Sequence, residues 1–207
     1  MMSTYQRRQW EMRRLDADRR REDNRDVNTS WHESGHVVCG YLLRLNPTKA
    51  TIVGGDGYSG LTHFGETDEE MTDHELAYAR AVVCMAGVEA QRLFGGYDGG
   101  GEQDAGVAAV VLGAVCRSEA EIDAVVESAR GVARAMLRTN FITLCEVAIA
   151  LIDRRSLDEA AIEEIIAANS DVGDDDDDDD GEVTLAEFIA GRGSRAMSPR
   201  LVKYRGL

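Results

Sequence analysis

Two histidines four residues apart, His32 and His36, enclose a glutamate in the run His-Glu-Ser-Gly-His. Residues i and i+4 of an α-helix share one face, so both imidazoles can reach the same point. This is the spacing of a zinc-peptidase helix, in which the glutamate acts as the general base. Zinc lowers the pKa of a bound water to about 7, and Glu33 could take the proton of that water without occupying the metal. The motif therefore predicts a metal-dependent hydrolytic centre.

The five-residue motif also has an ordinary interpretation, in which two surface histidines flank a helical glutamate. The residues that follow, 37–43, form an apolar run, which indicates that the motif opens a helix buried in a core. Histidines at the start of a buried helix usually need a partner there. We expect Thr29 or Ser30 to be the N-cap of this helix.

Two histidines leave a catalytic zinc one protein ligand short. The acidic and histidine side chains downstream that could supply the third ligand are His63, Glu66, His74, Glu89, Glu102 and Asp104. Asp104 is favoured because it follows a glycine-rich loop at the start of a helix, where backbone amides can steady its carboxylate. We expect His63 to lie on a strand surface or substrate rim, and Glu89 to be either an exposed helical residue or an orienting partner of a histidine.

The remaining pattern predicts an α+β fold that is mostly α. Strands at 49–53 and 58–64, separated by a glycine-rich turn, indicate a small hairpin beside the motif helix. Residues 60–64 are our candidate for an exposed edge that holds a substrate backbone. Capping boxes and apolar periodicity predict five further helices, over residues 73–94, 104–117, 118–138, 141–154 and 156–168.

Charge and length divide the chain into three expected parts: a charged helix or arm at 1–26, the motif-bearing domain at 27–170, and an acidic tail at 171–207. The net charge of −15 argues against nucleic acid as a partner. The four cysteines form no C-x-x-C pair and predict buried reduced thiols, as in the cytoplasm. The N-terminus lacks the apolar core of a signal peptide, and no run approaches the roughly 18 apolar residues of a membrane span.

The tail has two interpretations. A run of seven aspartates, Asp174 to Asp180, is typical of a solvated acidic tract. The same region also matches the spacing of a calcium EF-hand loop, with ligands at Asp176, Asp178, Asp180, Glu182 and Glu187. The match depends on the glycine at 181, the valine at 183, the threonine at 184 and the glutamate at 187, while the glycine at 173 interrupts an entering helix.

An ordered set of motifs resembles the peptidase domain of the FtsH-type zinc proteases over residues 27–168. The family shows a His-Glu-Ala-Gly-His helix, then a strand pair, then a helix with an Ala-Gly-x-x-Ala core and a Phe-Gly end. Here these are similar to 32–36, 51–62, 86–90 and 94–95. The family then places a zinc-binding aspartate four residues after a glycine, and this resemblance also selects Asp104, which follows Gly100.

The resemblance implies a zinc-dependent endopeptidase with a polypeptide substrate, and hexameric rings in the family imply a homo-oligomer. Two positions depart from the family pattern: Val88 stands where it has arginine, and Gln91 where it usually has glutamate. The chain also shows no nucleotide-binding loop, so the expected substrates are unfolded or delivered by a partner ATPase or unfoldase. Two alternatives stay open, a catalytically silent zinc-binding adaptor and a calcium-responsive regulator.

Overall fold

A computed structural model of the chain describes residues 24–55, 57–67, 71–94 and 101–170. The predicted calcium loop and most of the predicted N-terminal arm lie outside these residues. Within them the protein is mostly helical with one small antiparallel sheet, which confirms the α+β, mostly α prediction. No single described helix is long and apolar enough to cross a membrane. The pair Glu119–Thr139 and Phe141–Arg154, bent by 86°, passes that test only when joined.

The His-Glu-Ser-Gly-His motif lies within a long helix, residues 24–42, which we call the motif helix. Our expected N-cap at Thr29 or Ser30 is therefore wrong, because the helix already includes both residues. The Ser30 hydroxyl donates to the carbonyl of Val27 at 2.8 Å, which is how serine is accommodated inside a helix. The boundary that we expected between residues 26 and 27 also falls inside this helix.

Three strands form the sheet, in the order β2-β1-β3: β1 Pro47–Thr51, β2 Leu61–Phe64 and β3 Ser156–Asp158. The predicted hairpin is present, and β2 is an edge strand of this sheet. The third strand was not expected. The sequence pattern predicts that the last helix begins at residue 156, but Ser156 pairs with Thr51 in the sheet, and Asp158 caps α6 by accepting the amide of Ala161 at 3.0 Å.

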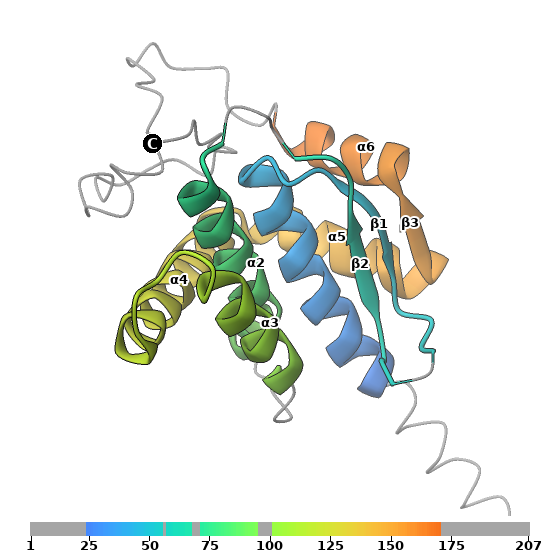
Figure 1. The fold of residues 1–207 in the computed structure, drawn as a ribbon. Helices are drawn as coiled ribbons and strands as arrows, with labels where there is room; N and C mark the ends of the chain where they lie inside the picture. The colour runs from blue at the N-terminus through green and yellow to red at the C-terminus, as the bar shows by residue number, and fades with distance from the viewer. Residues whose placement is uncertain (1–23, 56, 68–70, 95–100, 171–207) are drawn as a thin grey trace, which may run out of the picture.

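The helices after β2 enclose the core (Figure 1): α2 Asp73–Phe94, α3 Glu102–Leu112, α4 Glu119–Thr139, α5 Phe141–Arg154 and α6 Glu159–Ser170. The predicted capping box before α2 is present, since the Glu75 amide donates to the Thr72 hydroxyl and the Thr72 amide donates to the Glu75 carboxylate. Helix α2 packs against α3 and α4, while α6 packs against β1 and β3.

The motif helix lies between the sheet and α2 (Figure 1). Its Gly35 faces α2 so closely that an added Cβ would lie 2.4 Å from the Ala86 carbonyl oxygen. On the other side, a Cβ on Gly40 would meet the Phe64 ring at 2.4 Å. Small residues on both faces thus let a strand and a helix approach the motif helix within contact distance, so it is held from both sides.

Candidate metal centre

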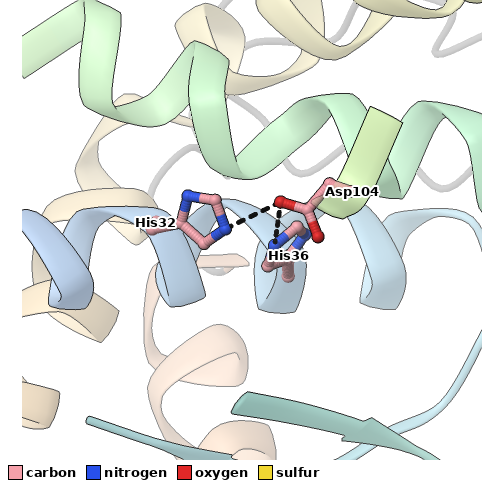
Figure 2. A group of neighbouring side chains, drawn as sticks. All are labelled: His32, His36 and Asp104. Carbon is pink, nitrogen blue, oxygen red and sulfur yellow. Dashed lines mark ion pairs between the residues drawn. The ribbon is translucent and has the colours of Figure 1, made fainter. Parts of the chain in front are cut away.

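Two elements bring three potential metal ligands together (Figure 2): His32 and His36 from the motif helix and Asp104 from the first turn of α3. Their ligand atoms all lie within 4.8 Å of one another, and they are the only such group of three among the described residues. The Nε2 atoms of His32 and His36 lie 2.9 and 3.7 Å from Oδ2 of Asp104. Asp104 thus approaches both imidazoles with a single oxygen.

The start of α3 carries Asp104 to the histidines. Gly101 caps the helix with a φ of 101°, in the left-handed region that favours glycine. A Cβ there would lie 2.1 Å from a methyl group of Val88 on α2, so only glycine fits this approach. Helix α3 begins two residues earlier than we expected, and Asp104 is its third residue.

The Nδ1 atom of each imidazole, the nitrogen that does not face Asp104, lies within hydrogen-bond distance of another protein group. Nδ1 of His36 lies 2.8 Å from the carbonyl oxygen of Val83, which can only accept, so Nδ1 carries a proton. Nδ1 of His32 lies 3.3 Å from Oε1 of Gln91, whose amide nitrogen donates to the carbonyl oxygen of Asn28 at 3.2 Å. That second bond orients the amide so that Oε1 faces the imidazole. Both Nε2 atoms therefore point toward Asp104, and each can bind a cation once it carries no proton.

A glycine on α2 makes room for the two rings. A Cβ on Gly87 would lie 2.6 Å from Cε1 of His32 and 2.7 Å from Nε2 of His36. Any side chain at position 87 would therefore displace the imidazoles or occupy the space between them. The backbone of α2 consequently forms one wall of the site.

Burial lowers the pKa of His36, but its hydrogen bond to Asp104 and the charges of Glu33 and Asp104 outweigh burial and raise that pKa to about 9. Burial raises the pKa of Asp104, and the two histidines lower it by more, to well below the usual carboxyl range. In the absence of a cation the carboxylate is therefore charged and His36 holds a proton. The proton on His36 balances the negative charge of Asp104, and a metal ion that binds here would replace that proton.

Glu33 lies beside this group with 4% of its surface exposed. Its Oε2 accepts a hydrogen bond from the Thr62 hydroxyl on β2 at 2.7 Å. A cleft of about 660 Å³ opens over the site and reaches from β2 to α3. The residues lining it include His32, Glu33, His36, Tyr58, Phe64, Cys84, Asp104 and Val107. Burial and the Asp104 charge raise the pKa of the Cys84 thiol to about 12, so it is protonated and a poor metal ligand.

Of our other ligand candidates, His63, Glu66, His74 and Glu102 are exposed side chains outside the group of three. Both interpretations of Glu89 are wrong. Its side chain is 1% exposed, and it pairs with arginines 92, 130 and 134 rather than with an imidazole. The orienting residues are Gln91 and the Val83 carbonyl, and only Gln91 left a signal in the sequence, as a departure from the family pattern.

The chain was also compared with known proteins. No protein-family model matches it, and a search of curated proteins finds no significant match.

Proposed function

We propose that the protein is a zinc-dependent endopeptidase that cleaves unfolded polypeptide. The observation that carries this proposal is the approach of His32, His36 and Asp104 to one point beside a buried glutamate, in an open cleft. The resemblance of the ordered motifs to FtsH-type peptidase domains supports the same assignment. A zinc peptidase requires these ligand types and a free carboxylate next to them.

The donor set fits zinc. Imidazole nitrogen and carboxylate oxygen are common zinc ligands, and three protein ligands leave a position for water in a catalytic site. His32, His36 and Asp104 would hold the ion, with Gln91 and the Val83 carbonyl fixing the orientation of the rings. When bound, zinc would supply a water of lowered pKa and polarise a substrate carbonyl.

Glu33 is the general base in this proposal. It follows His32 directly on the motif helix, so its carboxylate lies beside the ligands without belonging to their group. Its Oε2 is occupied by Thr62, which leaves Oε1 to accept the proton of the attacking water. The same carboxyl group then donates that proton to the leaving amine, so the carboxylate is regenerated in each turnover.

Strand β2 supplies a place for the substrate backbone. It pairs with β1 on one side only, and Leu61 and Thr62 line the cleft. An extended peptide can add to such an edge through main-chain hydrogen bonds. Only chain without its own folded structure can do so, and we therefore expect unfolded polypeptides, free or delivered by a partner unfoldase, to be the substrates.

The test is hydrolysis of an unfolded polypeptide, such as a reduced and denatured protein, by the purified chain without ATP. We expect cleavage that a chelator abolishes and that added zinc restores, with about one zinc per chain. The native form of the same substrate serves as the control and should resist cleavage. Zinc binding without any cleavage would overturn the peptidase proposal and favour the silent zinc-binding adaptor.

A further inference from the structure

Strand β2 and the residue just before it, Gly60, both lie against the proposed general base. The hydroxyl of Thr62 donates to Oε2 of Glu33 at 2.7 Å. Two residues earlier, a Cβ on Gly60 would lie 2.7 Å from Oε1 of Glu33 and 2.5 Å from a methyl group of Thr29. The backbone that leads into β2 therefore lies directly against the carboxylate.

These contacts follow from the alternation of a strand. Residues i and i+2 share a face, and Gly60, Thr62 and Phe64 all face the motif helix, the last against Gly40. Pairing of Thr62 with Ala50 on β1 fixes the register of β2. A slip of one residue would turn Thr62 away from Glu33, so the register of the sheet determines this contact.

Glu33 has little else to hold it. No lysine or arginine in the described part of the chain lies within 4.0 Å of its carboxylate, and Thr62 is the one side chain there that forms a hydrogen bond with it. A buried carboxylate needs such a donor, because an unsatisfied charged acceptor is costly. The hydroxyl thus holds one oxygen and leaves the other beside the small Gly60.

We propose that Thr62 is a positioning residue for the reaction. Its hydroxyl holds Glu33 in the rotamer that presents Oε1 to water, and it does so from the strand that binds the substrate backbone. This inference rests on the proposed function. Binding of a peptide along the edge of β2 would order the strand and the base together, so Thr62 should affect kcat rather than KM.

Three variants test this role in the zinc-loaded protein. Thr62→Val removes only the hydroxyl, Thr62→Ser retains it, and Thr48→Val removes a hydroxyl of β1 that bonds the His63 carbonyl instead of Glu33. We expect Thr62→Val to lower kcat about 10- to 100-fold, the range seen when a reacting group is misplaced by about 1 Å. KM and zinc content should stay at wild-type values, Thr62→Ser should recover most of kcat, and Thr48→Val should resemble the wild type. Wild-type kcat in Thr62→Val, or no rescue by serine, would overturn the proposal.

A second measurement does not depend on turnover. In a double-mutant cycle at saturating zinc, Thr62→Val should raise the unfolding equilibrium constant about fivefold or more when Glu33 is present. In the Glu33→Ala background the same change should have less than about a twofold effect, because no carboxylate is left unsatisfied. Equal effects in both backgrounds would show that Thr62 does not hold Glu33. A wild-type protein that binds zinc and cleaves nothing would overturn the proposed function and, with it, the role of Thr62 in turnover. The double-mutant cycle would still show whether Thr62 holds Glu33.

Discussion

Glu33 and Glu89 are the two most deeply buried glutamates among the residues that the structure describes, and their surroundings differ. Glu89 on α2 is 1% exposed and its charge is compensated by three guanidinium groups, with Arg134 Nε at 2.7 Å and Arg130 Nε at 3.8 Å. Glu33 is 4% exposed, and in the described part of the chain only the neutral Thr62 hydroxyl bonds to it. Glu89 is thus paired with permanent positive charges, whereas Glu33 lies beside an imidazole of the candidate metal centre and is held by one neutral donor.

The largest effect should come from Asp104, the third ligand of the candidate metal centre beside Glu33. Asp104→Asn should weaken zinc binding by more than the roughly 10- to 100-fold typical of outer partners of a ligand, because it removes a ligand charge. The helical content should be unchanged, since Asp104 is partly exposed at the start of α3. Competition against a zinc-binding dye measures this. Glu102→Gln, an exposed acidic residue two positions earlier, is the control, and a larger loss in that variant would contradict the assignment.

Substitution of Glu89, the glutamate that pairs with arginines, should lower stability and leave metal binding unchanged. Glu89→Gln leaves three arginines without their buried partner, and we expect the free energy of unfolding to fall by about 2 kcal/mol. Arginine side chains that are 29–45% exposed can turn to water, so the loss should stay below that of a fully buried pair. Denaturant unfolding together with zinc titration decides the point. Zinc affinity more than about tenfold weaker in this variant would place Glu89 at the metal centre and break the comparison.

Gln91 tests whether a partner outside the ligand group orients His32 at the metal centre. Gln91→Leu removes the acceptor for Nδ1 of His32 without touching Glu33, and outer partners of this kind are worth about 10- to 100-fold in metal affinity. Calorimetric zinc titration measures the change, with Gln103→Leu, an exposed residue of α3 at the cleft, as the matched control. Equal affinities of the two variants would show that Gln91 does not orient the ring.

The last test is a pH dependence, whose effect per pH unit is no larger than the effects above. His36 has a pKa raised to about 9 in the metal-free protein, so below pH 9 zinc must displace a proton from it. We therefore expect zinc affinity to rise about tenfold per pH unit up to about pH 9, whereas an ordinary histidine would stop contributing above about 6.5. Zinc titrations between pH 6.5 and 9.5 test this, and a flat profile above pH 7 would contradict the close pairing of His36 with Asp104.

Local patterns predicted most of the helices, because capping boxes and apolar periodicity act over a few residues. Helix α5 begins and ends at the expected residues, and the box before α2 has the expected bonds. Asp104 was favoured for its place after a glycine-rich loop, and the structure does bring it to the histidines. The start of the motif helix was missed because Ser30 favours a cap but also bonds well inside a helix.

The arginine partners of Glu89 could not be predicted from local sequence patterns. Its partner Arg134 is 45 residues away on α4, so the pairing depends on how two helices cross. The same reason hides the Val83 carbonyl, since a backbone group carries no residue-type signal. Strand β3 is three residues long, and its pairing with β1 spans more than 100 residues. Such contacts arise from the assembled core.

The most direct test of this account is the turnover of zinc-loaded Glu33→Gln on an unfolded polypeptide, with zinc content measured in the same preparation. The amide can replace the carboxylate in shape but cannot accept the proton of the water. We expect about one zinc per chain and a kcat at least about 100-fold below the wild type, within the range of general-base catalysis. Turnover at the wild-type rate in a fully zinc-loaded variant would contradict the role of Glu33 as the base.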